Sequence, residues 1–553
     1  MADGDPDVLI VGSGAGGGAA AWRLATRGIR VRVLDAGPQF DPARDFRQDR
    51  PDWETAFPTK DGSAGPYAVA PLQPLTPAMR DVRSWSKAGG PYVTGDRRAA
   101  FGYHHVRGVG GSSLHFTGEA HRLNPRSMRM RTDHGMAADW PVSYAELEPY
   151  WTLAETVVGV AGPALDRRCP RGAPYPQPAH RRSFASAALA RGAVAAGLTP
   201  VDNSLAVLSR PRDGRPDCNG CGGCLRGCQR GDKGSVDVTY LREAQATGNC
   251  EVVPMAEVLQ LTNDGRRVTG AVVAGADGLS VMRAPVVIVA AGAIQTPRLL
   301  LNSRGRHAPD GLANESGMVG RNFMETLLTT TSALHPDPLG SHRGLPVDWV
   351  AWDHNAPDAI PGVIGGCRFG PAMAESDLVG PIGYASRIVP GWGDDHRLAM
   401  RKTFGRVLSV AALGESLPHP GSYVDLDAGL DRHGMPVARI HSHLDDMALD
   451  RIRFMMRTCR DVVAAAGCTE TVEEFGSADA FSSTHVFGTC RMGTDPEASV
   501  VDAAGRSHRW PNLFVCDASV FPSSGGGEAP GLTIQALALR TADGIAAARR
   551  GSP

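Results

Sequence analysis

Short apolar runs, each followed by a segment with helical character, mark three separate parts of the chain. The run DVLIV at 7–11 precedes the small-residue segment AAAWRLA, and a second apolar strand, IRVRVLD, ends at residue 35. Val286–Ala290 is an unbroken apolar run, which is typical of a strand covered on both faces. Alternation of strands with helices favours a parallel sheet. One parallel sheet is therefore predicted from three distant segments, at 7–36, 235–303 and 511–548.

The remaining segments have other patterns. Residues 140–160 have helical periodicity with Ser143 as the candidate N-cap, and MALDRIRFMMRTCRDVVAAAG at 447–467 has the pattern of an amphipathic helix. The segment 37–95, rich in Pro, Gly and Asp, is predicted to form long loops over the active site. Strand-like runs mixed with loops at 326–479 predict a substrate domain. Three segments are predicted to form the cofactor-binding domain, at 1–135, 235–325 and 480–553. A helical and Cys-rich insertion at 136–234 separates the first from the second, and the substrate domain at 326–479 separates the second from the third.

The loop after the first apolar run matches a dinucleotide-binding pattern. Gly12, Gly14 and Gly17 fit G-x-G-x-x-G, and Asp35 ends the next strand. The first glycine permits a tight turn, the second lets the backbone approach a pyrophosphate, and the third permits close packing of helix on strand. The helix N-terminus attracts phosphate, and Asp35 is placed to accept hydrogen bonds from a ribose diol. These four residues predict a dinucleotide site but do not distinguish FAD from NAD.

Composition narrows the classes of partner. The chain has 553 residues, 42% hydrophobic and 21% charged, and a net charge of −1, so neither a nucleic-acid footprint nor a polybasic membrane patch is indicated. The longest apolar run, Ala284–Ile294, is too short for a transmembrane segment. The N-terminus has no basic and apolar leader, which predicts a cytoplasmic protein with reduced thiols.

Four blocks of sequence carry a family resemblance. They are GVGGSSLHF at 108–116, VVIVAAGAIQTPRLLLNS at 286–303, HVFGTCRMG at 485–493 and NLFVCDASVFP at 512–522. Together with the N-terminal glycine motif, they resemble the glucose–methanol–choline (GMC) oxidoreductase family of FAD enzymes. The resemblance extends from residue 7 to about residue 546, with the blocks in family order, although 330–475 carries no matching block. It implies an α/β fold in which a doubly wound, Rossmann-like FAD-binding domain carries an inserted substrate domain built on an antiparallel sheet.

The resemblance also implies an activity, the oxidation of a CH–OH group by proton removal and hydride transfer to N5 of the flavin. A base with a pKa near neutrality suits the proton transfer, and histidine is the usual choice. His485, which opens HVFGTCRMG, occupies the position of the family's catalytic histidine. The electron acceptor, oxygen or a redox partner, is not specified by any motif.

Further cofactor contacts are expected by resemblance. His115 stands where some family members bond a histidine covalently to flavin and where others only pack against the ring. Gly110 and Ser112 are expected to present backbone groups to the cofactor, and Asp517 to contact it near the phosphate–ribitol end. Thr533 follows in the C-terminal loop as a further candidate. Gly320, Arg321 and Asn322 match another family block, interpreted as a structural turn.

Four cysteines, Cys218, Cys221, Cys224 and Cys228, have the spacing C-x2-C-x2-C-x3-C. They match an iron–sulfur ligand run except that Gln229 replaces the usual proline, and thiolates suit zinc as well. Reduced thiols in a glycine-rich turn are the third alternative. Resemblance leaves the choice open: glucose and gluconate dehydrogenase subunits carry similar cysteines thought to hold a cluster. Long-chain alcohol oxidases have a similar loop followed by G-x-K, here GDKGS at 231–235, and are not known to hold one.

The C-terminal loop departs from the family pattern. Ala529 stands where most members have an asparagine that binds the substrate oxygen. The adjacent Glu528 is the candidate to orient the hydroxyl or to pair with a cationic substrate group, and the alternative is a solvent-facing glutamate. The first reading favours an aminosugar, as for the 6′-dehydrogenases of aminoglycoside antibiotic pathways that this family includes. A neutral sugar, a sterol or a long alcohol stays open, as do a redox-silent lyase of the hydroxynitrile lyase type and a non-catalytic flavin-binding protein.

Overall fold

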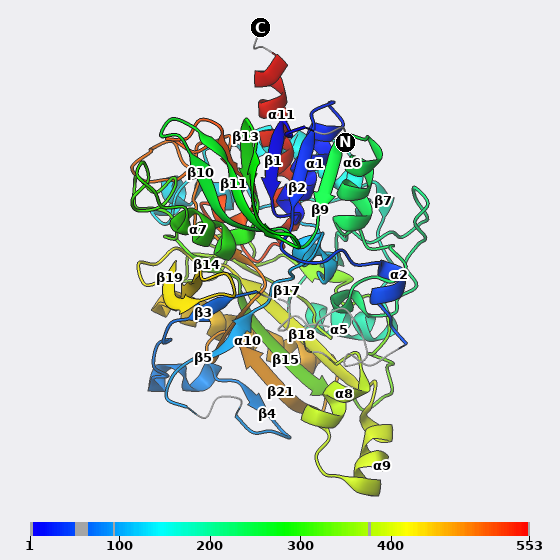
Figure 1. The fold of residues 1–553 in the computed structure, drawn as a ribbon. Helices are drawn as coiled ribbons and strands as arrows, with labels where there is room; N and C mark the ends of the chain where they lie inside the picture. The colour runs from blue at the N-terminus through cyan, green and yellow to red at the C-terminus, as the bar shows by residue number, and fades with distance from the viewer. Residues whose placement is uncertain (1–3, 50–64, 92–94, 374–375, 377, 551–553) are drawn as a thin grey trace.

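The computed structural model describes residues 4–49, 65–91, 95–373, 376 and 378–550, and they form two lobes (Figure 1). Parts of the predicted active-site loops, at 50–64 and 92–94, lie outside the described residues. The first lobe is built on a parallel sheet and the second on an antiparallel one. The predicted combination of a doubly wound α/β domain with an antiparallel-sheet domain is confirmed.

The parallel sheet has five strands, all contributed by the three segments that the sequence pattern indicates. In spatial order they are β24 (Leu513–Val515), β13 (Val286–Val289), β1 (Val8–Val11), β2 (Val31–Leu34) and β9 (Cys250–Val253). Each neighbouring pair is parallel and in continuous register, for example Ile10 opposite Ile288 and Val33. The central strands β1 and β13 are short and almost wholly buried because helices or a second sheet cover both faces, whereas the edge strand β9 is only partly buried.

Helices α1 (Ala15–Ala25) and α11 (Gly531–Arg550) pack against each other beside this sheet, and α4 (Tyr144–Val158) packs on α11. Ser143 caps α4 through a capping box with Glu146, as the sequence predicts for that helix start. A three-stranded antiparallel sheet, β10 (Glu257–Asn263), β11 (Val268–Gly275) and β12 (Gly278–Arg283), contacts β13, and helix α7 (Gly292–Asn302) follows β13.

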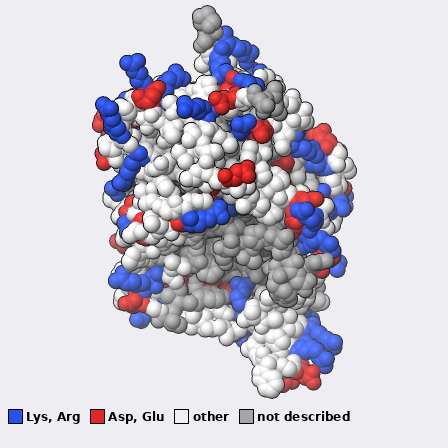
Figure 2. Space-filling view, in the orientation of Figure 1, with Lys and Arg blue, Asp and Glu red and all other residues white. Residues whose placement is uncertain are grey.

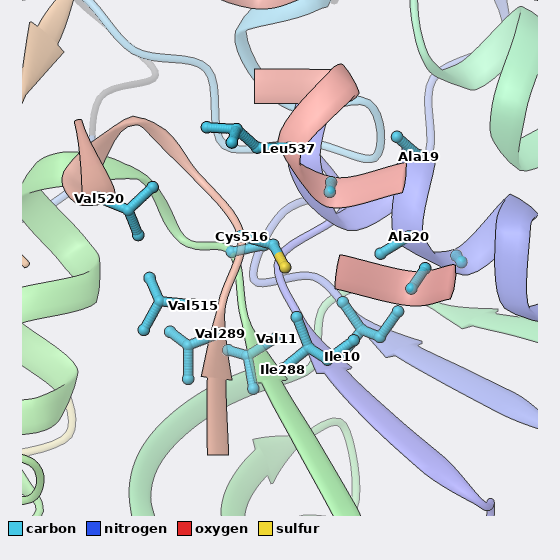
Figure 3. Packing of buried hydrophobic residues seen from close by; sticks show 14 of the residues in the cluster. Ile10, Val11, Ala19, Ala20, Ile288, Val289, Val515, Cys516, Val520 and Leu537 are labelled. Atoms are coloured by element: carbon cyan, nitrogen blue, oxygen red, sulfur yellow. The ribbon is translucent and has the colours of Figure 1, made fainter. Parts of the chain in front are cut away.

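The core of the first lobe depends on the small residues of α1. Side chains from β1, β13 and β24 gather beside α1 and α11 (Figure 3). A Cβ on Gly16 would lie 1.5 Å from the carbonyl oxygen of Cys516, and one on Gly17 would lie 1.9 Å from that of Gly12. The run of Gly and Ala therefore lets the helix approach the backbone of distant segments.

The second lobe contains a seven-stranded antiparallel sheet, called here the substrate sheet. Its order is β4 (Trp85–Ser86), β21 (Glu470–Gly476), β15 (Leu327–Leu334), β18 (Val407–Gly414), β17 (Cys367–Pro371), β16 (Trp349–Ala351) and β8 (Pro200–Asp202). Helix α10 (Asp446–Ala465), the predicted amphipathic helix, packs on one face together with α5 (Phe184–Ala195). The other face of β15 and β21 is free to form a cavity wall.

Three small pairings connect the lobes and complete the fold. The first is a three-stranded sheet in the order β19 (Tyr423–Leu430), β20 (Pro436–His441) and β3 (Tyr67–Val69). The other two are strand pairs, β5 (Ala99–Tyr103) with β22 (Ala480–Ser483) and β14 (Met324–Glu325) with β23 (Val486–Phe487). The other short elements are α2 (Pro42–Asp45), η3 (Pro77–Val82), η4 (Gly111–Leu114), η5 (Pro125–Arg129), α3 (Met130–His134), β6 (Ala161–Gly162), β7 (Gln177–Pro178), η6 (Cys224–Arg226), η7 (Asp237–Leu241), α6 (Arg242–Ala246), α8 (Pro381–Gly383), η8 (Tyr384–Ile388), α9 (Gly393–Thr403) and η9 (Ala518–Val520).

The residues predicted as a separate insertion, 136–234, are divided between the two lobes. Helix α4 packs in the first lobe, whereas α5 and strand β8 belong to the second. Strand β4 likewise brings residues from the predicted loop segment 37–95 into the substrate sheet. The predicted substrate range 326–479 therefore omits both outer strands of its sheet, because such short strands have no pattern of their own.

The surface carries both signs of charge. On the face shown in Figure 2, acidic and basic side chains lie interspersed. Among the described residues, no helix combines the length and the apolar character needed to cross a bilayer.

Candidate functional site

One cavity of about 920 Å³ extends from the glycine loop of the first lobe to the substrate sheet of the second. It opens at the carboxyl ends of β1 and β13, which is where α/β sheets bind ligands. Its lining includes Gly12, Gly14, Asp35, Ser112, His115, Glu119, Leu328, Thr330, Ser332, Glu473, Phe475, His485, Asp517 and Ala529. Seven candidate residues therefore meet at one place: Gly12, Gly14, Asp35, Ser112, His115, His485 and Asp517. The candidates that do not line the cavity are Gly17, Gly110, Glu528, Thr533 and the four cysteines at 218–228.

The glycine motif has the backbone conformation that its pattern requires. Gly12 has a φ of 95°, and a Cβ there would lie 2.5 Å from the carbonyl oxygen of Ala290. Gly14 is the N-cap of α1, and no side chain caps this helix. The N–H groups of the first turn therefore point into the cavity without a capping partner, as a phosphate-binding helix N-terminus requires.

Asp35 fixes the glycine loop as well as lining the cavity. Its Oδ2 accepts from the hydroxyl and the backbone N–H of Ser13, at 2.5 and 3.1 Å, and its Oδ1 accepts from Gly37 N at 2.9 Å. Ser13 Oγ in turn accepts from the backbone N–H of Gly110 at 3.0 Å. This chain of bonds places the loop that contains His115 against the glycine motif.

The loop at 108–116 forms the short helix η4, and buried His115 follows it on the cavity wall. Ser112 lines the cavity, and its Oγ accepts from Val106 N at 3.3 Å. Lys233, which is 1% exposed, donates through Nζ to the carbonyl oxygens of Leu114, Phe116 and Cys224, at 2.9, 3.0 and 2.7 Å. Lys233 therefore ties this loop to the cysteine segment, a role that the G-x-K pattern alone did not reveal.

Asp517 lies on the cavity wall beside the N-terminus of α7. Its Oδ2 accepts from Gly292 N at 2.9 Å and from Thr296 Oγ1 at 2.5 Å, and its Oδ1 accepts from Ser519 N at 2.8 Å. Burial raises the pKa of this carboxyl, while these hydrogen bonds act in the opposite direction. Through these hydrogen bonds, Asp517 holds the end of β24, η9 and the N-terminus of α7 together at the cavity wall.

His485 lies between the two lobes, directly before β23. Its carbonyl oxygen accepts from Thr326 N at 3.0 Å and from Ser483 Oγ at 2.8 Å, and its side chain lines the cavity. Thr326, directly before β15, and Ser483, at the end of β22, thus hold the backbone of this residue where the cavity passes from the glycine loop to the substrate sheet. The position suits a group that acts on a substrate held between them.

Sequence reasoning missed a buried network beside Ala529. His121 Nδ1 accepts from the backbone N–H of Ala529 at 3.0 Å, and its Nε2 pairs with Oδ1 of Asn203 at 2.8 Å. Since Nδ1 is an acceptor, the proton lies on Nε2. Burial lowers the pKa of His121 well below its usual value, so the ring is neutral.

The same network holds a carboxylate at the cavity wall. Glu119 accepts from Arg368 Nη2 at 2.6 Å and from Asn203 Nδ2 at 2.9 Å. It lines the cavity together with Ala529 and His485. The signal in the sequence was the polar alternation in TGEAH directly after GGSSLHF, which the motif itself does not include.

Glu528 is buried, contrary to the alternative of a solvent-facing glutamate. Its Oε1 accepts from Arg168 Nη1 at 2.9 Å, Asn124 N at 3.0 Å and Asn355 Nδ2 at 2.9 Å. The carboxylate therefore pairs with a cation of the protein itself. Thr533 likewise faces the protein, since its Oγ1 accepts from Trp151 Nε1 at 3.2 Å.

Comparisons with known proteins agree with this architecture. Two family models described as GMC oxidoreductase match residues 126–327 and 418–538, and a model of an NAD(P)-binding Rossmann-like domain matches 10–41. The 2-methyl-1,2-propanediol dehydrogenase of Mycolicibacterium austroafricanum is 31% identical, over 98% of this chain and 95% of its own length. The chain belongs to the GMC oxidoreductase family.

Other GMC relatives span nearly the whole chain. Paromamine 6′-oxidase of Streptomyces fradiae is 30% identical, over 98% of this chain and 91% of its own length. The fructose dehydrogenase large subunit of Gluconobacter japonicus is 28% identical, over 98% of this chain and 97% of its own length. Pyridoxine 4-oxidase from "Mesorbium loti" superposes with a TM-score of 0.62 at 19% identity, covering 98% of this chain and 99% of that one. At that identity the structural likeness supports the fold alone.

GMC oxidoreductases bind FAD, and the residues of this chain fit such a cofactor. The uncapped N-terminus of α1 suits a pyrophosphate, and Asp35 suits a ribose. Gly111 completes the cradle, because a Cβ there would lie 2.8 Å from the Cα of Gly14 and close the space between the two loops. The flavin end would then lie between His115 and His485.

The four cysteines do not form a ligand set in this structure. Among the described residues, which include all four, no group of three or more His, Cys, Asp and Glu side chains is arranged to hold a metal ion. Cys218 packs beside an apolar cluster, Cys221 is exposed, and Cys228 donates to Asp232 Oδ1 at 3.1 Å. The turn supports the alternative of reduced thiols, and its glycines Gly220, Gly222 and Gly227 all have positive φ.

The family block Gly320–Asn322 is a structural turn, as expected. Gly320 has a φ of 86°, and a Cβ there would lie 2.0 Å from the carbonyl oxygen of Val424. Its N–H donates to Thr489 O at 2.7 Å, which places the turn against the segment that follows His485. The turn therefore packs against the segment that contains His485 without lining the cavity.

Proposed function

We propose that this GMC oxidoreductase oxidises a CH–OH group of a sugar-like substrate to the carbonyl. The observation that carries the proposal is that one continuous cavity joins the FAD-binding loop to a face of the substrate sheet with both polar and apolar side chains, and that His485 lines the same cavity. Hydroxyl and charged side chains, including Thr330, Ser332 and Glu473, line the far part of this cavity. Such a wall suits a substrate with several hydroxyl groups better than a sterol or a long-chain alcohol.

The chain's own residues have distinct roles in this reaction. His485 removes the proton from the substrate hydroxyl, since an imidazole is the side chain suited to accept a proton near neutral pH. FAD, when bound, supplies the hydride acceptor. Hydrogen bonds from Thr326 N and Ser483 Oγ to its carbonyl oxygen fix the backbone of His485 at the cavity wall.

Most members of the family have at position 529 an asparagine that binds the substrate, and this chain has alanine there. Glu119 is the polar side chain that can take over this contact. Both residues line the cavity with His485, and Arg368 and Asn203 hold the carboxylate of Glu119 in position. A carboxylate there accepts a hydrogen bond from a neighbouring hydroxyl or amino group of the substrate. It thereby positions the reacting hydroxyl, whose single proton is left for His485. Glu528 does not line the cavity. Its hydrogen bond with Arg168 fixes the loop that leads to Ala529.

Within sugar-like substrates, we favour one that carries an amino group. Two relatives that align with 98% of this chain are called paromamine 6′-oxidase and 6′′′-hydroxyparomomycin C oxidase, and each is 30% identical to it. In both cases the name refers to the oxidation of an amino-bearing sugar compound. The cavity of this chain offers carboxylates, Glu119 and Glu473, to such a substrate.

The test is an anaerobic screen of the FAD-loaded enzyme against sugars, aminosugars, aliphatic alcohols and sterols. Bleaching of the flavin absorbance by sugars or aminosugars supports the proposal. Cleavage of a cyanohydrin without bleaching would instead identify a lyase, and bleaching by sterols alone would exclude the sugar-like substrate.

The role of His485 is tested with His485→Asn, which should keep its FAD but reduce the flavin roughly 10²–10⁴ times more slowly. His396→Asn, in the exposed helix α9, is the matched control and should retain the wild-type rate. Near-normal flavin reduction in His485→Asn would exclude the residue as the base.

A further inference from the structure

Glu473 is a buried carboxylate that takes no part in the proton transfer of the proposed reaction. It lies on β21, is 4% exposed and lines the cavity. Its Oε2 has no hydrogen-bond partner among the described residues. Its Oε1 lies 3.4 Å from Nη1 of Arg387, which is longer than a direct hydrogen bond of an ion pair. Because Glu473 lines the cavity, a donor on a bound molecule can satisfy this oxygen and remove the cost of leaving it buried without a partner.

The substrate sheet places this carboxylate far from the base. Glu473 pairs in register with Ser332 on β15, and both line the cavity. At the other end of β15, Leu328 also lines the cavity, two residues after Thr326, whose N–H bonds to the carbonyl oxygen of His485. Ser332 lies four positions after Leu328 along β15, which corresponds to about 13 Å between their Cα atoms.

The wall between these two ends is suited to a sugar ring. Thr330 and Phe475 form the cross-strand pair next to Ser332 and Glu473, and both line the cavity. An aromatic face beside a hydroxyl is complementary to the C–H face and the hydroxyl edge of a pyranose. A substrate extending from His485 to Glu473 would have its middle part on this pair.

We propose that Glu473, with Ser332 beside it, forms a second substrate subsite that binds an amino group at the end of β15 remote from His485. This inference rests on the proposed function for the position of the reacting hydroxyl. It assigns the recognition of a cationic group to the substrate sheet and to Glu473, in place of Glu528.

The chemistry of the subsite favours an ammonium group over a neutral hydroxyl. Burial raises the pKa of Glu473 to about 7, and the contact with Arg387 does not offset this effect. An ammonium supplies a charged donor for Oε2, the oxygen that Arg387 does not contact, since Arg387 lies beside Oε1. Ser332 Oγ, which lies 2.7 Å from Ser409 Oγ, offers a second acceptor to the same group.

The same strand provides a matched control. Glu474, the next residue, points to the opposite face of β21, where it accepts from Arg460 of α10 at 2.6 and 2.7 Å. A Glu474→Gln variant removes the same charge from the same strand without altering the cavity. Glu473→Gln tests the subsite, and Glu473→Asp keeps a carboxylate there if the amide variant fails to fold.

The experiment compares two pairs of oligosaccharides on the full-length, FAD-loaded enzyme. Fully deacetylated chitobiose and chitotriose carry amino groups, whereas cellobiose and cellotriose are their neutral counterparts. Dissociation constants are measured by calorimetry and KM values by anaerobic flavin reduction. We expect Glu473→Gln to weaken binding of the amino sugars by about tenfold or more and to change that of the neutral sugars much less. Glu473→Asp should retain part of the preference, and Glu474→Gln all of it.

Two readouts separate this inference from the proposed function. If the wild-type enzyme prefers amino sugars, and Glu473→Gln abolishes the preference in binding without any sugar reducing the flavin, the subsite stands and the proposed reaction fails. If sugars reduce the flavin but the ratio of dissociation constants is the same in wild type and Glu473→Gln, the subsite is wrong and the reaction stands. Equal binding of amino and neutral sugars by the wild type also overturns the subsite.

Discussion

Arg168 donates from Nη1 to Oε1 of Glu528 at 2.9 Å, and both side chains are almost wholly buried. The guanidinium also lies over the ring of Trp352, 4.1 Å from its centroid, and donates from Nη2 to the carbonyl oxygen of Arg122 at 2.8 Å. Glu528 thus anchors the loop before α11 to the segment that precedes α4. Its charge is compensated inside the protein, which gives it a positioning role beside Ala529.

Glu528→Gln should therefore destabilise the protein without selecting among substrates. The variant leaves Arg168 buried without its counter-charge, and breaking such a pair costs about 3–5 kcal/mol. Thermal unfolding should show the loss, and KM should change by the same factor for an aminosugar and for its neutral counterpart. A rise in KM confined to the aminosugar would show instead that Glu528 contacts the substrate.

Lys233→Met should weaken FAD retention. The substitution keeps the length of the side chain but leaves the carbonyl oxygens of Leu114, Phe116 and Cys224 without their shared donor. Each buried acceptor left unpaired costs about 1–3 kcal/mol. The loop that carries His115 should therefore loosen, and the FAD content after gel filtration should fall.

The exposed Lys402 in α9 provides the control for this prediction. Lys402→Met should retain as much FAD as the wild type. Equal FAD content in Lys233→Met would show that the loop does not depend on the ammonium group.

Glu415→Gln should change how stability depends on pH. Burial raises the pKa of the Glu415 carboxyl to about 7, although Arg451 acts in the opposite direction. The folded protein therefore holds a proton that the unfolded chain releases near its ordinary pKa of 4.5. The contribution of this group is present below that pH and is lost as the pH rises to about 7.

Denaturant unfolding at several pH values between about 4 and 8 checks this sign. The wild type should lose stability relative to Glu415→Gln as the pH rises, by about 3 kcal/mol at most. Glu470, a partly exposed residue that pairs with Lys87, provides a control substitution to Gln. A constant difference between wild type and Glu415→Gln would mean that the carboxyl is not perturbed by burial.

The cysteine segment should hold no metal. Serine replacement of Cys221 and Cys228 together should leave the visible spectrum of the purified enzyme unchanged, as that of flavin alone. Iron and zinc contents of the wild type, measured by mass spectrometry, should be far below one atom per chain. Stoichiometric iron with an added absorbance near the flavin bands, lost in the double variant, would restore the ligand interpretation.

Local signals were sufficient for much of the fold. The unbroken run at 286–289 and the glycine motif at 12–17 specify their strand and turn through the residues they contain, and both appear in the structure as predicted. The serine N-cap of α4 is equally local. In contrast, the two-residue strand β4 has no periodicity, so its place at the edge of the substrate sheet was not predictable.

The residues of the candidate site likewise fall into those that sequence motifs predicted and those that only the tertiary structure brought to the cavity. Motifs placed Gly12, Asp35, His115 and His485 on one cavity, because each lies in a segment whose conformation its neighbours determine. Motifs did not find Glu119, His121 or Glu473, since their surroundings come from segments that are distant in the chain. Asn203 and Arg368 hold the first two, and the pairing of β21 with β15 brings the third to the cavity.

The sequence by itself therefore determined the family, the parallel sheet, the dinucleotide loop and the histidine proposed as the base. Only the tertiary structure decided which carboxylates face the cavity, and it placed Glu473 there while pairing Glu528 with Arg168. The physical reason is that a backbone turn depends on contacts a few residues apart. The charge balance around a buried carboxylate depends on every segment that packs against it.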